Sequence, residues 1–351
     1  MSKSSTKLKQ NVRGSQGLPR IVVTMGDPAG IGPEIVLRAM VSEPVRSMAS
    51  CRVVGDLPWL ERWNRRFRAG ARIVPAGVVD ESSPEVVSVH HVPALGARGV
   101  AVGRASAAAG RAALAYLDAA LGLLKEGDAD ALVTAPVSKE AVVRAGVRFV
   151  GHTEYLAEAT NTKRVAMMFV GGPFRLVLVT RHVPLAEVSR QLTPRRLRDA
   201  AELLAQALVR HFGCRRPRIA VCGLNPHAGE AGAMGREEQQ VIEPVLRRLR
   251  AQGWRLEGPM ASDALFYNAY RGEYDGIVCM YHDQALIPLK MAFRDIGINV
   301  TLGLPFVRTS PDHGTAFDIA GKGIADPLSM MEAIRLAARM MVATRGARWR
   351  C

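Results

Sequence analysis

Short, wholly apolar runs alternate with amphipathic or alanine-rich stretches along most of this chain. The runs RIVVTM (20–25), CRVVG (51–55) and EVVSVHHV (85–92) have the composition of buried strands, and each ends at or next to glycine or proline. Helix-like patterns fall between such runs, at residues 57–67 and 101–125. Parallel strands need crossover connections of this kind. The alternation therefore predicts an α/β fold with a largely parallel sheet.

The length of the chain favours more than one domain. At 351 residues and 48% hydrophobic composition, it exceeds what one typical domain needs. We expect a first α/β domain built from residues 20–140 together with 300–351. Residues 141–299 would form a second α/β domain. Residues 1–19, rich in Lys, Ser and Gln, are expected to be a disordered tail.

Composition also restricts the setting and the partners of the protein. No apolar run reaches membrane-spanning length, and the five cysteines form no CxxC pair, so we expect a cytoplasmic protein without a membrane partner. Cys222 and Cys279 lie in apolar runs and are expected to be buried rather than catalytic. The formal net charge of +15 is scattered, without interleaved aromatic residues, so no nucleic-acid partner is expected.

Histidines follow three strand-like runs in the second half of the chain. His182 comes after RLVLVTR, His227 after RIAVCGLNP and His282 after YDGIVCMY. Open α/β sheets place ligand sites at the carboxyl ends of strands, so these histidines favour a metal site with one open coordination position. A divalent cation there would polarise a hydroxyl or carbonyl oxygen. The spacing alone does not choose among a dehydrogenase, a hydrolase and a lyase.

A glycine-containing turn, GDPAGIGPEI, follows the first strand-like run directly. Pro33 and Glu34 mark the start of a helix there, so the turn offers free N–H groups to an anion. The glycines do not have the GxGxxG spacing of a dinucleotide-binding fingerprint. A tight structural turn and a substrate-facing loop containing Asp27 both remain open.

Five motifs together resemble one known family. TMGDPAGIGPEI, GHTEYLAE, GLNPHAGEAGAMGREE, MYHDQALIPLK and NVTLGLPFVRTSPDHGTAFDIAGKGIAD look, in order, like those of the 4-hydroxythreonine-4-phosphate dehydrogenase family of pyridoxal phosphate biosynthesis. The resemblance covers roughly residues 20–343. It implies two α/β/α domains with a cleft between them, similar to the isocitrate and isopropylmalate dehydrogenases. It also implies a homodimer with the active site at the subunit interface, with the nucleotide on the domain of residues 20–140 and 300–351 and with the metal, the substrate and the dimer contact on the domain of residues 141–299.

The same resemblance implies a reaction and a set of residues. The reaction is a metal-dependent, NAD- or NADP-linked oxidation of 4-hydroxythreonine 4-phosphate to 2-amino-3-oxo-4-phosphooxybutanoate, which decarboxylates to 3-amino-2-oxopropyl phosphate. One divalent metal, Zn, Co, Mg or Mn, would be held by His182, His227 and His282. The small phosphorylated hydroxy acid would be held by His152, Thr153, Lys290, Asn299 and Arg308. A lysine and an arginine together suit a phosphate.

Two roles stay open. The general base is unresolved among Asp263, Asp283 and His152, and Asp263 could equally be the N-cap of the helix that follows it. The segment DHGTAFDIAGKG is similar to the loop HGSAPDIAGKG that wraps the adenosine of the nucleotide in isopropylmalate dehydrogenases. That likeness implies that the cofactor is bound by His313, Gly314 and Asp318. A purely structural turn, with Thr315 as a helix cap, is the rival interpretation.

Departures from the family pattern leave alternatives. Ala285 stands where the family usually has glycine after HDQ, and Arg181 precedes His182 where a small hydroxyl residue is commoner. The alternative function is a D-threonate or D-erythronate 4-phosphate dehydrogenase of the same family, because Lys290 and Arg308 do not separate an amine from a hydroxyl. A more remote alternative is a basic polyanion-binding protein on the same scaffold.

Overall fold

The computed structural model describes residues 17–77, 83 and 85–346. Most of the expected N-terminal tail, residues 1–16, lies outside the described residues. The strands are β1 (Arg20–Thr24), β2 (Ser50–Gly55), β3 (Arg72–Pro75), β4 (Val86–His91), β5 (Ala131–Thr134), β6 (Ala166–Gly171), β7 (Phe174–Leu178), β8 (Ile219–Cys222), β9 (Leu256–Met260), β10 (Gly276–Cys279), β11 (Ile298–Leu302) and β12 (Val307–Pro311).

Helices connect most of these strands. The α-helices are α1 (Gly32–Met40), α2 (Glu43–Arg46), α3 (Leu57–Phe67), α4 (Ala107–Glu126), α5 (Lys139–Arg144), α6 (His152–Ala159), α7 (Val188–Gln191), α8 (Pro194–Phe212), α9 (Glu243–Ala251), α10 (Ser262–Tyr270), α11 (His282–Phe293) and α12 (Leu328–Thr344). Shorter turns are η1 (Leu185–Glu187), η2 (Pro226–Gly232), η3 (Glu238–Ile242) and η4 (Arg294–Ile296).

Within the described residues the strands form one twelve-stranded sheet, in the order β3-β4-β2-β1-β5-β12-β11-β6-β7-β10-β8-β9. The first wing, β3 to β12 in that order, is parallel throughout, and so are β7, β10, β8 and β9 of the second wing. Only the pairs β12–β11, β11–β6 and β6–β7 are antiparallel. The predicted α/β fold with a largely parallel sheet is confirmed, and the reversal at its centre was not expected.

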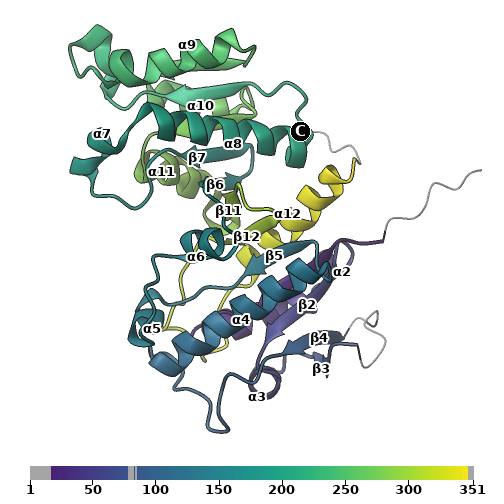
Figure 1. The fold of residues 1–351 in the computed structure, drawn as a ribbon. Coiled ribbons are helices and arrows are strands. Elements are labelled where there is room, and N and C mark those ends of the chain that lie inside the picture. The colour runs from purple at the N-terminus through teal and green to yellow at the C-terminus, as the bar shows by residue number, and fades with distance from the viewer. Residues whose placement is uncertain (1–16, 78–82, 84, 347–351) are drawn as a thin grey trace, which may run out of the picture.

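The two wings occupy opposite ends of the molecule (Figure 1). The second wing with α8, α9 and α10 lies at the top of the view, the first wing with α4 lies at the bottom, and α12 lies between them. Because β11 pairs with both β12 and β6, the sheet continues from one wing to the other. The domain boundaries at residues 140 and 300 stay a prediction.

Local signals explain where the main helices begin. Residues 57–67 form α3 as predicted, and the carboxylate of Asp56 caps it by accepting from the Trp59 amide at 3.2 Å. The helix expected at 101–125 begins later, at Ala107, because the Ser106 hydroxyl caps the amide of Ala109 at 3.2 Å. Among the described helices, only α4 has the length and hydropathy of a membrane span. It packs against β1, β2, β5 and α5, which makes it a core helix of the first wing.

The core follows the sheet on both faces. One large cluster of buried side chains covers the first wing and continues into the second along α8 and α12. A second cluster lies under α10 and α11 and includes Ala285, Cys222 and Cys279, all fully buried. The expectation of buried cysteines at these two positions is therefore confirmed. Ala285 packs as an ordinary core residue of α11 where the family usually has glycine.

Candidate functional site

A pocket of about 350 Å³ opens where the loop after β5, the start of α6 and the adjoining ends of β11 and β12 meet. The predicted site residues that line it are His152, Thr153, His182, Asn299, Arg308, His313 and Gly314. Outside its lining are His227, His282, Lys290, Asp263, Asp283 and Asp318. The predicted substrate residues, apart from Lys290, therefore share one pocket wall.

The guanidinium of Arg308 forms the charged floor of this pocket. Its side chain is only 2% exposed, and it donates to the hydroxyls of Thr301 at 3.1 Å and Thr134 at 2.5 Å. Its Nε has no hydrogen-bond partner among the described residues. Burial lowers the pKa of Arg308 to about 9, while the charge of Glu154 acts in the opposite direction. Arg308 is therefore a buried cation held by neutral groups at neutral pH.

Two further polar atoms in the same wall are shielded from solvent without a partner in the described part of the chain. They are Nε2 of His152 and Oδ1 of Asn299. Burial, followed by the charges of Arg308 and Lys139, holds the pKa of His152 well below its usual value, so the imidazole is neutral. Buried polar atoms without hydrogen-bond partners, close to a cation, indicate a binding site in which a polar ligand would supply the missing hydrogen bonds.

His182 and His282 come together at the carboxyl ends of the neighbouring strands β7 and β10. Their ring centroids lie 5.5 Å apart. Nδ1 of His282 lies 2.7 Å from the Asp283 carboxylate. A proton on Nδ1 would leave the lone pair of Nε2 free to bind a metal. His182 has a φ of 47°, in the left-handed region that non-glycine residues rarely adopt. The pKa of His182 is lowered, and burial is the largest cause.

His227 lies apart from that pair. It follows β8, which is the other neighbour of β10, but its side chain is 65% exposed and its Nδ1 faces Glu230 at 3.0 Å. No group of three His, Cys, Asp or Glu side chains that could hold a metal is formed within residues 17–77, 83 and 85–346. One chain therefore gathers two of the three predicted ligands, and the three-histidine assignment stays a prediction.

The backbone of η2 explains why His227 stands away. From His227 to Ala231 every φ is positive, between 42° and 84°. The buried carboxylate of Glu238 holds the start of this segment by accepting from the amides of Leu224 at 2.7 Å and Asn225 at 2.8 Å. A run of left-handed residues redirects the chain outward, and only Gly229 adopts such a conformation without steric strain.

The candidates for the general base have different surroundings. Asp283 is exposed and orients His282. Asp263 is exposed in the first turn of α10, where its Oδ1 accepts from the next amide at 2.9 Å. The N-cap of α10 is Ala261, so the interpretation of Asp263 as that cap is wrong. His152 alone lies in the pocket, with a neutral ring and an unpartnered nitrogen.

Two of the less certain positions have charged partners. Lys290 lies 3.2 Å from the carboxylate of Asp312, which lines the pocket, so the lysine reaches the pocket rim through that residue. The guanidinium of Arg181 lies 3.6 Å from Glu154 on α6. Arg181 is thus joined to the pocket wall beside His182.

The two glycine-containing loops of the sequence pack against each other. The amide of Ile31 donates to Thr315 O at 3.0 Å, and a Cβ on Gly30 would lie 2.9 Å from the Thr315 side chain. His313 and Gly314 line the pocket, whereas Asp318 does not. No helix begins at Thr315 in the described chain, since α12 starts at Leu328. The helix-cap interpretation of Thr315 is wrong.

Asp27 resolves the question left open for the first loop. Its side chain is fully buried, and Oδ1 accepts from the Ala29 amide at 2.9 Å. Its own amide donates to Pro136 O at 2.9 Å, which ties the loop after β1 to the loop after β5. Asp27 therefore holds the turn from inside and does not face the pocket.

The sequence interpretation missed Lys139 and Thr134, which both line the pocket. The charge of Lys139 contributes to lowering the pKa values of His152 and His182. Lys139 lies just after β5, at the carboxyl end of a strand. The rule that singled out the three histidines would also have found it.

Comparisons with known proteins agree over nearly the whole chain. A family model described as pyridoxal phosphate biosynthetic protein PdxA matches residues 47–337. The 4-hydroxythreonine-4-phosphate dehydrogenase of Geobacter metallireducens is 45% identical over 324 residues, which cover 92% of this chain and 95% of that protein. The D-threonate 4-phosphate dehydrogenase of Cupriavidus necator is 42% identical over 328 residues, covering 93% and 98%.

A solved structure has a similar fold over nearly the whole chain. The 4-hydroxythreonine-4-phosphate dehydrogenase of Klebsiella pneumoniae superposes with a TM-score of 0.84 at 38% identity. The match covers 93% of this chain and 98% of that chain.

Proposed function

The chain belongs to the family of the pyridoxal phosphate biosynthetic protein PdxA, and we propose that it oxidises 4-hydroxythreonine 4-phosphate in the biosynthesis of pyridoxal phosphate. It is an enzyme, an oxidoreductase that acts on a CH–OH group, as its curated relatives are. The product would be 2-amino-3-oxo-4-phosphooxybutanoate, which decarboxylates to 3-amino-2-oxopropyl phosphate. NAD or NADP would be the oxidant.

The observation that carries this proposal is the buried guanidinium of Arg308. A cation that is 2% exposed and bonded only to hydroxyls is poorly compensated, and a phosphate supplies the missing charge and acceptors. Nε2 of His152 and Nζ of Lys139 stand in the same wall. Asn299, with an unpartnered Oδ1, is suited to accept from a hydroxyl or amine of the substrate.

The histidines fit a divalent metal in part. His282 and His227 each have Nδ1 against a carboxylate, a pairing that leaves Nε2 for a metal, and His182 lies beside His282. When bound, the metal supplies Lewis-acid polarisation of the substrate oxygen, and the nicotinamide accepts a hydride. Zn, Co, Mg and Mn all stay open.

His152 is our proposed acceptor of the hydroxyl proton. Among the three candidates it lines the pocket, and its neutral ring has a free nitrogen. Asp283 is already engaged in orienting His282. Asp263 is the remaining alternative if a second chain brings it to the pocket.

We also propose that the enzyme is a homodimer with shared active sites. On α10, Tyr267 and Tyr270 are 66% and 60% exposed, and on α11, Ile287 and Met291 are 58% and 85% exposed. The rings of Tyr270 and Phe293 stack at 6.1 Å, so the two helices form one apolar face. Large exposed apolar faces mark interfaces. Because α11 begins at His282, a partner on this face would lie beside the incomplete metal site.

The remaining parts of the proposal concern the cofactor and the compartment. We assign the adenosine side of NAD or NADP to the loop of His313, Gly314 and Asp318, which packs on the turn around Gly30. We assign the enzyme to the cytoplasm, because Cys51, Cys222 and Cys279 form no disulfide within the described residues, which is compatible with a reducing environment.

The proposal is tested with a panel of substrates. The purified enzyme receives 4-hydroxythreonine 4-phosphate, D-threonate 4-phosphate or D-erythronate 4-phosphate, each with NAD or NADP and with Zn, Co, Mg or Mn. The expected result is metal-dependent formation of reduced cofactor, fastest with 4-hydroxythreonine 4-phosphate. Absence of reduced cofactor with every combination would exclude the dehydrogenase function.

One alternative has its own supporting observation. The relative from Cupriavidus necator, 42% identical to this chain, is a D-threonate 4-phosphate dehydrogenase. The two substrates differ at one carbon, by an amine against a hydroxyl, and both carry the phosphate that Arg308 suits. A higher kcat/KM with D-threonate 4-phosphate in the same panel would decide for this alternative.

A further inference from the structure

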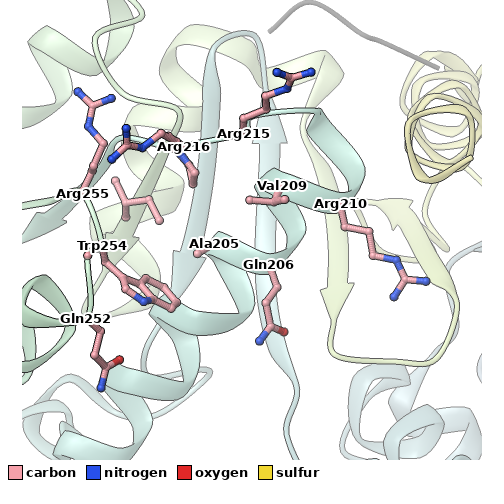
Figure 2. A pocket seen from close by; sticks show the side chains of 12 residues that line it. Ala205, Gln206, Val209, Arg210, Arg215, Arg216, Gln252, Trp254 and Arg255 are labelled. Atoms are coloured by element: carbon pink, nitrogen blue, oxygen red, sulfur yellow. The ribbon is translucent and has the colours of Figure 1, made fainter. Parts of the chain in front are cut away.

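A second pocket lies in the second wing, between the C-terminal part of α8, the start of β8 and the turn before β9. Its volume is about 640 Å³, within the range of small-molecule sites. It shares no lining residue with the pocket around Arg308. Figure 2 shows the indole of Trp254 inside it, with Arg216 and Arg255 on one side and Arg210 on the other.

The charged side chains that line this second pocket are all positive. Its lining contains Arg210, Arg215, Arg216 and Arg255 but no acidic residue. None of these four side chains forms a hydrogen bond or ion pair with another residue in the part of the chain that the structure describes. Positive charge without neighbouring acids attracts anions, and the guanidinium groups of Arg216 and Arg255 lie on the same side of Trp254 (Figure 2).

Arginines elsewhere on the same helix behave differently. Near the start of α8, Arg195 pairs with Asp199 at 3.7 Å and Arg198 pairs with Glu202 at 3.9 Å. Arg210, in the last turn of α8, is suited to the negative end of the helix dipole and needs no ligand. Arg215, Arg216 and Arg255 lie outside any helix, so that explanation does not extend to them.

The floor of the second pocket is apolar. Ala205 and Ile219 are buried beneath it, and the Trp254 ring is half-buried at its side. The turn is fixed, because the Trp254 amide donates to Leu249 O at 3.2 Å and Arg255 O accepts from the Ile219 amide at 3.0 Å. A fixed indole beside an apolar floor suits a planar ring, and stacking on such a ring is favourable.

We propose that this second pocket binds a phosphate ester of a planar aromatic ring. The ring would pack between Trp254 and the apolar floor, and the phosphate would be held by the guanidinium groups of Arg216 and Arg255, with Arg215 nearby. A polynucleotide is disfavoured, because the basic groups surround one concavity with a single aromatic residue rather than a stacking track. Two sources share this chemistry, a nucleotide and a phosphorylated pyridine.

The experiment is calorimetric titration of the full chain with AMP and with pyridoxine 5′-phosphate, which lacks a reactive aldehyde. Inorganic phosphate is the anion without a ring. We expect one of the two ring-bearing esters to bind more tightly than phosphate. In Arg216→Gln/Arg255→Gln the affinity should fall about tenfold or more, because two charged hydrogen-bond donors are lost. Which ester binds identifies the source.

Two further variants separate the ring from the charge. Trp254→Leu should weaken the ester about fivefold or more and leave phosphate binding unchanged, since one stacked ring contributes that much. Arg195→Gln, on the same helix but outside the pocket, should bind within about twofold of the wild type. Arg215→Gln serves as an independent test if the double variant is unstable.

The proposal is distinct from the dehydrogenase function. Turnover of phosphorylated hydroxy acid should be unchanged in the Arg216→Gln/Arg255→Gln and Trp254→Leu variants. AMP that binds only at a nicotinamide site would bind all these variants equally, which would overturn the proposal. Binding of duplex DNA in place of both esters, or binding of neither ester, would overturn it as well.

Discussion

At the scale of single residues, the Arg308 guanidinium sets the electrostatics of the main pocket. Burial lowers its pKa to about 9, yet it stays protonated at neutral pH and has two threonine hydroxyls as partners. A buried charge that is hydrogen-bonded only to two hydroxyls and compensated in part by Glu154 is costly, and an anionic ligand would reduce that cost. Under the proposed function, Arg308 would therefore contribute more to the binding of a phosphorylated substrate than the half-exposed Lys290.

Arg308→Gln should therefore raise KM for the phosphorylated substrate about 10- to 100-fold, equivalent to about 1.5 to 3 kcal/mol. The value of kcat should change less, since the phosphate is bound in both the ground state and the transition state and is not itself altered by the oxidation. Steady-state kinetics measure both constants. A matched control is Arg195→Gln, which lies on α8 outside the pocket.

Inorganic phosphate gives a second measure of the same prediction without catalysis. It should raise the melting temperature of the wild type and have little effect on Arg308→Gln. Equal stabilisation of both proteins, with an unchanged KM, would remove Arg308 from the phosphate site.

Asp27 is a second buried residue whose ionised form is energetically unfavourable in the folded protein. Burial raises its pKa to about 6, and the amides of Ala29 and Ser138 only partly offset that rise. The folded state therefore binds a proton more tightly than the unfolded chain, whose aspartates titrate near pH 4. The stabilisation from this proton is fully present below about pH 4 and is lost as the pH rises through about 6.

The corresponding variant is Asp27→Asn, which cannot ionise but keeps the acceptor for the Ala29 amide. Between pH 4 and 7 the wild type should lose up to about 3 kcal/mol of unfolding free energy relative to the variant. Urea melts of both proteins across that range measure the difference. A difference that is flat with pH would mean that Asp27 titrates normally in the folded protein.

At the scale of elements, apolar periodicity was enough to predict α3, and a single hydroxyl decided where α4 begins. The strands that carry His182, His227 and His282 were predicted correctly, and the structure makes them neighbours. The direction of the left-handed segment η2 was not predictable. It depends on five consecutive positive φ angles and on a tether from Glu238, which lies many residues later in the chain.

Contacts between distant loops were likewise outside what local patterns encode. The turn after β1 and the segment after β12 each had a recognisable composition, but the hydrogen bond from Ile31 to Thr315 joins residues far apart in sequence. The arginine-lined second pocket was also missed, because the net positive charge was interpreted as scattered, and Arg210, Arg216 and Arg255 were not singled out from the sequence. Only the tertiary fold brings them together, from the end of α8, the segment before β8 and the turn before β9.

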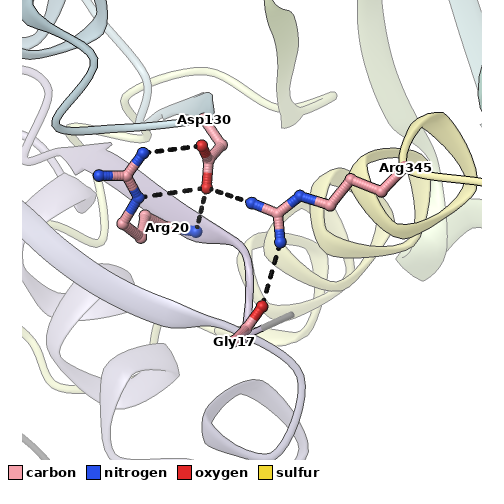
Figure 3. Close-up of polar contacts among 4 residues, drawn as sticks. All are labelled: Gly17, Arg20, Asp130 and Arg345. Carbon is pink, nitrogen blue, oxygen red and sulfur yellow. Dashed lines mark hydrogen bonds and ion pairs between the residues drawn. The ribbon is translucent and has the colours of Figure 1, made fainter. Parts of the chain in front are cut away.

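Another long-range contact ties the two ends of the described chain to the sheet (Figure 3). The carboxylate of Asp130, just before β5, accepts from the Arg20 amide at 2.8 Å and from the Arg345 guanidinium at 2.8 Å. Arg345 also donates to Gly17 O at 3.0 Å. Burial raises the pKa of Asp130, but the hydrogen bonds from Arg20 and the charges of both arginines outweigh it, so the pKa is lowered.

Asp130→Asn should reduce the free energy of unfolding by about 1 to 2 kcal/mol, after allowance for solvent screening. Because the folded pKa is lowered, this contribution is present above about pH 4 and disappears as the pH falls through the folded value. Urea melts at pH 7 and at pH 3 test both statements. Asp128→Asn, on the same turn, should have a much smaller effect, and an equal loss in both variants would contradict the assignment to Asp130.

At the scale of the whole molecule, one chain brings together two of the three proposed metal ligands, close to an exposed apolar face. His182 and His282 lie together, whereas His227 projects outward on η2. A two-fold symmetric dimer through α10 and α11 would let each chain give its His227 to the other chain's pair. The dimer would then be required for catalysis and not only for stability.

Co-expression of two inactive chains tests this arrangement. A His182→Ala chain and a His227→Ala chain should each be inactive alone and low in metal. If His227 is given to the partner, random pairing makes about half of the dimers mixed, and each mixed dimer has one intact site, so about a quarter of the activity returns. His182→Ala with His282→Ala should recover nothing, because those residues act from the same chain. Adding Met291→Glu to both chains should abolish the recovery by charging the apolar face. Activity below detection in the first pairing, with dimers intact, would mean that all three histidines serve one chain.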